Sequence, residues 1–328
     1  MLIYNGFNLT NLLAPEAVQI LRPRRCGIIT EGIHLLRTLR ISSHVAVLAT
    51  TVLVGVAAPA FAQDAARGAP DDMAARADAD TITIGVGAAF VPDYEGSNNN
   101  KWSAAPVAIG TVGGFGFSVL GNRASIDLIP DKASNGLDFQ AGPIGVLNFN
   151  RQSTKGIDDD RVRALGKIKT AIEVGGYVGV GKTGVITSPY DKLSVTLSYR
   201  HDVNNSHDSA IWQPTVSYLM PVSTKAALAL FGSAEHAGRG YANTYFSITP
   251  TQSAVSTLPV YNASKGWKSY TLGGAVTYSL TGDLLQGFKL VAGGTYVRLL
   301  NDFADSPVTS IAGSKSQWLG AVGIGYTF

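Results

Sequence analysis

The sequence predicts an all-β fold, a transmembrane antiparallel β-barrel of twelve strands with both termini in the periplasm. Three observations predict it: large apolar residues alternate with small or polar ones along most of residues 81–328, a secretory signal precedes them, and the last strand ends on an aromatic residue. A period of two places one face of each strand against lipid and the other in a lumen. If Gly121-Asn122 were a kink inside one strand, ten strands would remain.

The segment before the barrel has the three parts of a secretory signal. Arg37 and Arg40 form its basic part, and an apolar core follows at residues 45–56. Ala60 and Ala62 complete an A-x-A motif, which predicts cleavage after Ala62. The core is too short for a membrane-spanning helix, which needs about 20 apolar residues. We therefore expect an exported protein without helical membrane anchors.

These features divide the chain into three parts. Residues 1–62 form the leader. Its residues 1–36 are expected to be an artefact of the assigned start, and the alternative is a real, poorly structured extension. Residues 63–80 are polar, Ala-rich and unpatterned, which predicts a flexible periplasmic segment. Residues 81–328 form the barrel, which is expected in the cell outer membrane.

Charge balance and cysteine count exclude several classes of function. Five of the 26 Lys and Arg residues and two of the 23 Asp and Glu residues lie in the leader, so residues 63–328 carry no net charge. Nucleic-acid binding needs a basic surface, which this part lacks. The one cysteine, Cys26, also lies in the leader. We therefore expect neither a disulfide framework nor a thiolate metal site, and no cofactor.

Alternation places the strands along the barrel region. It is most regular at residues 81–91, 192–202, 210–220 and 268–280, where the apolar face tends to carry an aromatic residue near one end. Helical periodicity is nearly absent. The twelve predicted strands are 81–91, 102–110, 115–120, 123–129, 137–149, 168–180, 192–202, 210–220, 225–236, 268–280, 287–299 and 316–328.

The connectors between these strands alternate between two kinds. Connectors such as 111–114 and 221–224 are short, whereas 150–167, 237–267 and 300–315 are longer and more polar. An even strand count with short connectors at one end is typical of a barrel inserted from the periplasm. Both termini then lie at the short-connector end.

The last strand carries a predicted assembly signal. Counting back by twos from Phe328 gives Tyr326 and, further on, Trp318, so one face is apolar with an aromatic at each end. A strand of this kind resembles the sorting signal of bacterial outer-membrane barrels. We therefore expect the barrel-assembly machinery to be a partner, together with outer-membrane lipid and lipopolysaccharide.

Three segments and the last strand resemble the MipA/OmpV family of outer-membrane proteins. The segments are the stretch from Pro92 to Ser97 after the first strand, the long loop 245–264 with its Tyr-Phe, Gln-Ser-Ala and Leu-Pro-x-Tyr pattern, and residues 298–307. The resemblance covers essentially all of residues 81–328. Its loop-motif positions are Pro92, Tyr94, Glu95, Gly96, Tyr245, Gln252, Ser253, Pro259 and Tyr261.

The resemblance implies an outer-membrane barrel without catalytic residues. Some family members are described as scaffolds that join a lytic transglycosylase to a penicillin-binding protein, and others as adhesins or porin-like proteins. The function expected from the resemblance is therefore a non-enzymatic scaffold for the murein-remodelling machinery. The alternative is a small-solute channel or a porin-like or adhesin protein.

The polar loops allow more than one interpretation. Asp93, Glu95 and the run Asn98–Asn100 are expected on a solvated turn, with a cation or lipopolysaccharide contact as the alternative. The long connector 237–267 either folds over or into the lumen or offers a recognition surface, and folding in is favoured. Charged residues are predicted mainly on inward faces, where opposite charges commonly pair across a lumen; they are Arg123, Asp127, Lys169, Glu173, Arg200 and Glu235.

Two motifs that suggest enzymes are better explained by the fold. Residues 176–183 match the pattern of a phosphate-binding P-loop, but a turn follows them where the chemistry needs a helix N-terminus. Residues 200–209 gather Ser, His and Asp at one rim, including His201 and His207. A nucleophile needs its base and an orienting group to converge, and neighbouring rim residues need not do so. We therefore expect mobile loop side chains and no enzyme.

Overall fold

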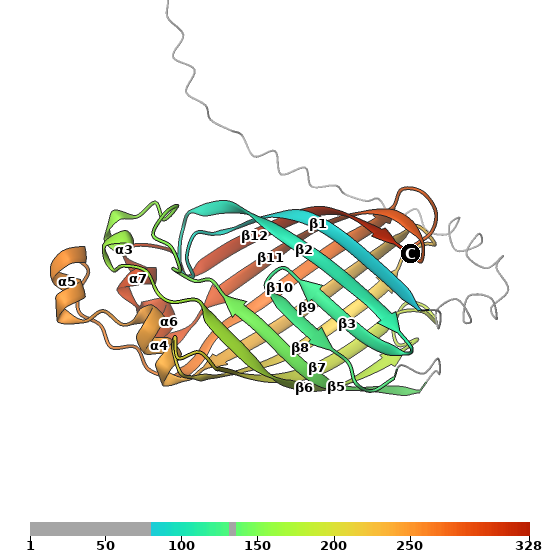
Figure 1. Cartoon of the computed structure of the whole chain (residues 1–328), viewed down its shortest axis with the longest axis horizontal. Coiled ribbons are helices and arrows are strands. Elements are labelled where there is room, and N and C mark those ends of the chain that lie inside the picture. Colours follow the sequence, from blue (N-terminus) through green and yellow to red (C-terminus); the bar gives the residue numbers. More distant parts are fainter. Residues whose placement is uncertain (1–79, 131–135) are drawn as a thin grey trace, which may run out of the picture. The chain divides into compact units, whose positions relative to one another are not determined.

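The computed structural model describes residues 80–130 and 136–328, and within them twelve antiparallel strands close into a barrel (Figure 1). This confirms the predicted fold class and strand count. The leader 1–62, with the predicted cleavage site at Ala60 and Ala62, lies outside the described residues. So does the segment 63–80 except for Asp80, and the predicted domain division stays a prediction.

The strands follow one another around the barrel in chain order, and the first pairs with the last. They are β1 (Thr81–Pro92), β2 (Asn100–Val112), β3 (Phe115–Leu120), β4 (Arg123–Ile126), β5 (Leu137–Asn148), β6 (Ala171–Thr183), β7 (Lys192–Asp202), β8 (Ala210–Pro221), β9 (Ala226–Ala237), β10 (Gly266–Ser279), β11 (Gly287–Leu299) and β12 (Ser316–Thr327). The short helices are α3 (Asp160–Ala164), α4 (Arg239–Phe246), α5 (Pro250–Ser256), α6 (Asn301–Asp305) and α7 (Pro307–Ser310).

Each predicted strand has its counterpart, with small shifts at the ends. β4 ends at Ile126 rather than at residue 129. The Asp127 carboxylate there accepts the backbone N–H of Ile129 and of Ala141. Beyond Ile126, single backbone bonds from Asp127 to Gly116 and from Leu128 to Ala141 replace the regular ladder. β6 runs from Ala171 to Thr183 rather than over 168–180.

β1 and β12 close the barrel along a seam rich in glycine. Thr83 lies opposite Thr327, and Gly85 and Gly87 lie opposite Gly325 and Gly323. A Cβ atom on Gly85 would lie 2.7 Å from the Ile324 carbonyl oxygen. Without side chains, the two backbones approach closely enough to complete the ladder. The Thr83 and Thr327 hydroxyls, 2.6 Å apart, bridge the seam on its inner side.

Aromatic side chains form two belts on the outer face. One belt contains Trp102, Tyr199, Trp212, Trp267 and Trp318, and the other contains Phe115, Phe139, Tyr278, Phe288 and Phe328; all ten are exposed. Trp318 packs against Tyr296 and Tyr326 packs against Phe288, each with 4.9 Å between ring centroids. Two aromatic belts around an apolar band mark the levels at which a barrel meets the two membrane surfaces.

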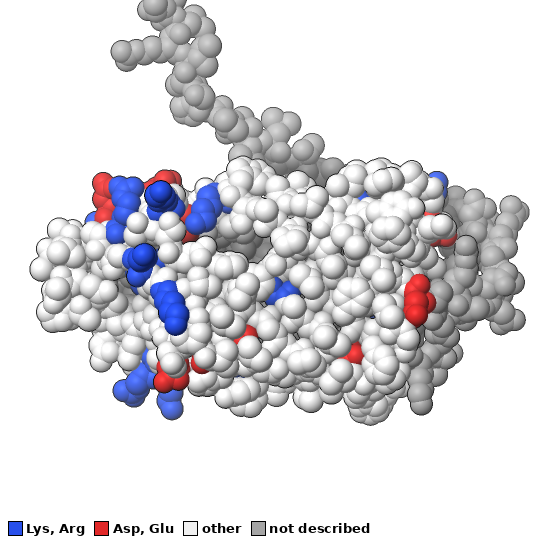
Figure 2. Space-filling model, in the orientation of Figure 1, with Lys and Arg blue, Asp and Glu red and all other residues white. Residues whose placement is uncertain are grey.

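The two ends of the barrel differ. All the described helices gather at one end, called here the loop end, whereas the C-terminus lies at the other, the terminal end (Figure 1). On the face shown in Figure 2, Lys and Arg side chains gather around the loop end, and fewer charged side chains appear on the wall beyond it. None of the helices formed by residues 80–130 and 136–328 is long and apolar enough to cross a membrane.

The hairpin of β3 and β4 is much shorter than its neighbours. Gly121 has a φ of 60°, and Leu120 pairs with Arg123 across the turn. The turn at Gly121-Asn122 is therefore real, which removes the ten-strand alternative. Because β3 and β4 are short, this turn lies partway up the wall rather than at the loop end (Figure 1).

Deletion of Phe328, or its replacement by Asp, is expected to impair barrel assembly while leaving export intact. The Phe328 N–H donates to the Ile82 carbonyl at 2.9 Å, and its ring packs on Tyr326, so the residue ties the end of β12 to β1. Outer-membrane fractionation and heat-modifiable gel mobility measure the effect. Val222→Asp is the matched control because Val222 is 59% exposed in a turn at the same end, against 68% for Phe328. Equal assembly of both variants would contradict the prediction.

Candidate functional site

The long connectors fold into a cap over the loop end. α4 and α5 come from the β9–β10 connector, α6 and α7 from the β11–β12 connector, and α3 from the β5–β6 connector. One apolar cluster unites Tyr245 and Phe246 of α4 with Phe303 of α6, all fully buried. This confirms that the connector 237–267 folds in. It also has helices of its own, which the sequence did not predict.

The loop after β1, which begins where Pro92 ends that strand, anchors the second cluster of the cap. Tyr94 is buried and its hydroxyl donates to the Ala312 carbonyl at 2.7 Å. Gly96 has a φ of 99°, and a Cβ atom there would lie 2.7 Å from the Thr309 hydroxyl, so only glycine fits without strain. Asp93 is buried as well. The interpretation as a solvated turn is therefore wrong for Asp93, which the cap covers, whereas Asn98 is exposed.

The motif residues of the long loop shape the cap. Gln252 and Thr249 form a capping box at the start of α5, which also carries Ser253. Tyr261 makes a two-way backbone bridge with Ile248, and its hydroxyl donates to the Asp302 carbonyl at 3.1 Å. Pro259 lies between these elements. Thr249, Gln252 and Tyr261 thus hold the loop's own structure together.

Beneath the cap, a charge network crosses the lumen. Its carboxylates are Glu95, Glu173 and Glu235, and its cations are Arg123, Arg200 and Lys268. Lys268 Nζ lies 2.6 Å from a Glu95 oxygen and 3.0 Å from a Glu235 oxygen. Arg200 continues the chain, because it pairs with Glu235 and, at 2.5 Å, with Glu173. Glu95 thus reaches down from the cap to the wall.

Arg123 joins the network through neutral groups. Its Nη1 atom donates to the Gln213 side-chain oxygen at 2.8 Å, and that same oxygen accepts from Arg200 at 3.0 Å. The Arg123 Nη2 atom lies 3.5 Å from the Ser198 hydroxyl. Among the described residues, Arg123 is the network cation without a carboxylate in ion-pair contact. Four of the six charged residues predicted to face inward are thus members of the network: Arg123, Glu173, Arg200 and Glu235.

Two predicted inward charges lie elsewhere. Lys169 donates to the Asn204 carbonyl in the loop region, and the Asp127 carboxylate accepts the backbone N–H groups of Ile129 and Ala141 after β4. Lys268 also joins the network, although regular alternation along β10 would place its side chain on the outer face, together with that of Tyr270. A register shift between Trp267 and Ser269 turns the Lys268 side chain inward. A charge on the lipid face would be costly, so the bulge has a physical reason.

The two rim histidines separate. His201 keeps a partly exposed ring whose Nδ1 lies 2.9 Å from the Asp202 carbonyl oxygen. His207 is buried, with Nε2 3.3 Å from a Glu173 oxygen and its ring 5.1 Å from that of Tyr241. The Asp202 carboxylate fixes the connecting loop by accepting four backbone N–H groups. The expectation of mobile loop side chains is wrong for His207. No cluster of three metal-binding side chains occurs among residues 80–130 and 136–328.

Burial in the cap also changes the acidity of its side chains. Burial, with Glu95 nearby, raises the pKa of Tyr241 well above its usual value, and burial likewise raises the pKa of Tyr245. Both hydroxyls therefore stay protonated, and that of Tyr241 donates to Glu95 at 2.6 Å. Burial lowers the pKa of Arg151 to about 10, and this guanidinium donates to the Thr244 carbonyl at 3.1 Å.

Below the network, part of the lumen lining is exposed. By register, Ile109, Leu219 and Val291 face inward in the terminal half, yet they are 43%, 45% and 39% exposed. Within the network, by contrast, Arg200, Glu173 and Lys268 are almost fully buried. The lining of the terminal half is therefore exposed in part, whereas Lys289 and Thr327 are buried there, and the loop end is filled.

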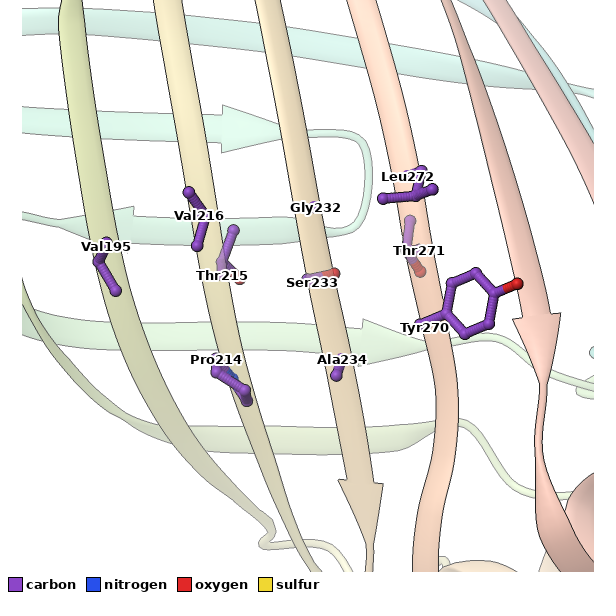
Figure 3. Close-up of a pocket in the computed structure, with 10 residues that line it drawn as sticks. All are labelled: Val195, Pro214, Thr215, Val216, Gly232, Ser233, Ala234, Tyr270, Thr271 and Leu272. Carbon is purple, nitrogen blue, oxygen red and sulfur yellow. The ribbon is translucent and has the colours of Figure 1, made fainter.

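A depression of about 310 Å³ lies on the outer wall of β7–β10 (Figure 3). Val195, Val216 and Leu272 surround Gly232, where the missing side chain leaves the space, while Thr271 points to the lumen side. The depression faces the lipid and is separate from the charge network.

Lys268→Met is expected to destabilise the barrel by about 3–5 kcal/mol, because it leaves the largely enclosed carboxylates of Glu95 and Glu235 without this cation. Methionine keeps most of the volume of the stem. Urea unfolding in lipid vesicles, followed by gel mobility, measures the loss. Arg163→Met is the control; it removes an exposed pair with Asp160 and should cost at most about 1 kcal/mol. Similar losses in the two variants would show that Lys268 is not a central member of the network.

Comparisons with known proteins identify a matching family and solved structures of low sequence identity. A family model described as MltA-interacting protein MipA matches residues 84–328. An outer membrane channel from Pseudomonas putida F1 is 12% identical with a TM-score of 0.40, over 76% of this chain and 95% of that one. OccAB3 of Acinetobacter baumannii is 10% identical with a TM-score of 0.32, over 73% of this chain and 59% of that one. No curated protein matches the chain.

The family match begins inside β1 and ends at Phe328, so it spans all twelve strands and the connectors that form the cap and the network. The predicted resemblance is confirmed over this range. The chain therefore belongs to the MipA family of outer-membrane β-barrel proteins.

Proposed function

We propose that this barrel is a non-enzymatic scaffold that holds murein-remodelling enzymes at the outer membrane. The observation that carries the proposal is the filled loop end, where the cap and the charge network occupy the lumen between Glu95 and Glu173. A barrel filled in this way anchors partners better than it conducts solutes. The family description, which refers to interaction with MltA, supports a lytic transglycosylase as one partner. A penicillin-binding protein is the second proposed partner.

The proposal requires an orientation and a mature form. We place the terminal end in the periplasm, with residues 1–62 removed as the leader and residues 63–80 preceding β1 as the periplasmic segment. The short turns at that end then face the murein layer. Among the turns with described residues, the one between β6 and β7 offers the best contact surface.

Asp191 makes this turn rigid. Its carboxylate accepts the backbone N–H groups of Val185, Ile186 and Thr187 at 2.5–2.9 Å, and the Tyr218 hydroxyl at 2.7 Å. Ile186 is nevertheless 66% exposed, and Val185 and Tyr190 are exposed beside it. Exposed apolar side chains on a preorganised turn suit a protein contact, because little conformational entropy is lost on binding.

A small-solute channel is the second candidate. It is favoured by the water-exposed lumen lining at Ile109, Leu219 and Val291. Planar-bilayer conductance separates the two functions. The scaffold predicts no steady conductance from the purified barrel, together with retention of a lytic transglycosylase by the immobilised barrel. Steady single-channel currents that grow when residues 241–263 are deleted would instead favour the channel.

Ile186→Asp is expected to reduce retention of the lytic transglycosylase by at least about tenfold, because a charge replaces the apolar contact at the centre of the turn. Val222→Asp is the matched control in a neighbouring turn and should retain the enzyme normally. Assembly, followed by heat-modifiable mobility, should be unchanged in both. Full retention by Ile186→Asp would remove this turn from the proposal.

Retention is also expected to be independent of pH between about 8 and 5. Burial alone would raise the pKa of Asp191, but the N–H of Thr187, the Tyr218 hydroxyl and the N–H groups of Val185 and Ile186 together lower it below its usual range. A lowered carboxylate pKa means that the turn keeps its full stabilisation above the unfolded pKa of about 3.9 and loses it only as pH falls through the folded value. Asp191→Asn should weaken retention at every pH in that range. A loss of wild-type retention near pH 6 would contradict this account.

A further inference from the structure

The barrel wall contains an opening beside β2. β3 pairs only with residues 107–112 of β2, and β4 pairs only with residues 144–146 of β5. The hairpin turn makes its last wall contacts where Gly121 N–H donates to the Pro106 carbonyl and Leu147 N–H donates to the Asn122 carbonyl, both at 2.9 Å. Residues 101–105 of β2 pair with β1 on one side. On their other side, above these two bonds, no described residue pairs with them, and this side is called here the free edge.

This opening is closed on its upper side. The Glu95 N–H donates to the Asn150 side-chain oxygen at 3.0 Å, which joins the loop after β1 to the loop after β5. Lys101 on the free edge donates to the Asp93 carbonyl at 3.2 Å. The opening is therefore a window framed by β2, the hairpin turn, the end of β5 and the cap. Figure 2 shows a hollow in the wall at this place, between β2 and the hairpin turn seen in Figure 1.

The window lies at the level of the membrane. Trp102, in the aromatic belt near the loop end, belongs to the free edge and packs on Phe90 at 5.3 Å between ring centroids. Exposed Leu147 lies across the window on β5. Unpaired backbone groups facing a bilayer core are costly unless they border a polar or water-filled space. A free strand edge just inside the aromatic belt therefore indicates a route between the outer leaflet and the lumen.

Behind the window, the inner wall combines one cation with an apolar strip. Arg123 starts β4 at the hairpin turn and faces the lumen, where its partners are the neutral Gln213 and Ser198. Leu120 pairs with Arg123 on the same inner face and is 50% exposed, and Ile109 continues the apolar strip on β2 toward the terminal end. A cation without a carboxylate partner, next to exposed apolar side chains, complements a molecule with an anionic head and an apolar chain.

We propose that the window admits an amphipathic carboxylate of the fatty-acid type from the outer leaflet, and that its head binds Arg123 while its chain lies along Leu120 and Ile109. The route avoids the cap, which fills the axis of the barrel above the charge network. The proposal goes beyond the scaffold function, since it concerns the lumen and the wall rather than the turns at the terminal end.

Equilibrium binding of tritiated palmitate to the full barrel in detergent micelles tests the site. Arg123→Gln should weaken binding by at least about tenfold, because a charge-assisted hydrogen bond is lost, and Arg123→Lys should restore part of it. Hexadecanol, with the same chain and no charge, should bind the wild type at least about tenfold more weakly than palmitate. Lys289→Gln is the matched control; it removes a buried lumen cation at the terminal end, where Lys289 bonds Thr327 at 2.5 Å, and should leave palmitate affinity unchanged.

The route is tested by kinetics. Ser103 lies on the free edge, faces inward by register and is exposed, so Ser103→Trp should slow palmitate association at least about tenfold while Ser103→Ala should not. Heat-modifiable mobility confirms that each variant assembles. Palmitate binding that is equal in wild type and Arg123→Gln, or equal for palmitate and hexadecanol, would overturn the proposed site. Unchanged association in an assembled Ser103→Trp variant would overturn the window as the route.

Discussion

Closure of the strand ladder in lipid is the constraint on which the rest of this structure depends. A backbone group in the bilayer core has no water molecule to hydrogen-bond with, so each strand must pair with a neighbour on both sides. The first strand must therefore pair with the last. The glycine seam between β1 and β12 meets this need by letting the two backbones approach at Gly85 and Gly325. The outward apolar positions and the two aromatic belts follow, because a closed ladder leaves only side chains to face the membrane.

The filled loop end is the second consequence of a closed wall. Connectors that leave the barrel at one rim can bury apolar surface only against one another and against the lumen. Tyr245, Phe246 and Phe303 do so above the network, and Tyr94 ties the first connector to the last. Charges beneath this cap must be paired because burial makes an isolated charge costly. Lys268 pairs with both Glu95 and Glu235, and these ion pairs link the cap to the wall.

The short β3–β4 hairpin is the one place within the described wall where pairing stops well below the cap. The free edge of residues 101–105 departs from the rule that governs every neighbouring strand, and Arg123 lies directly below it with neutral partners. Local departures from otherwise consistent packing are where function is expected. The network and the window are thus connected, because the Gln213 side-chain oxygen accepts hydrogen bonds from both Arg123, below the window, and Arg200 of the network.

By itself, the sequence determined the barrel, its twelve strands and their inner and outer faces, because a period of two in side-chain character is a local property that each strand carries. It also pointed to the charges Glu173, Arg200 and Glu235, since these lie on inward positions of regular strands. Only the tertiary structure decided which charges meet, that a bulge turns Lys268 inward and that His207 is buried. It also decided that β3 and β4 stop short of the cap. These outcomes depend on contacts between residues far apart in the chain, such as Glu95 with Lys268, and no local pattern records such contacts.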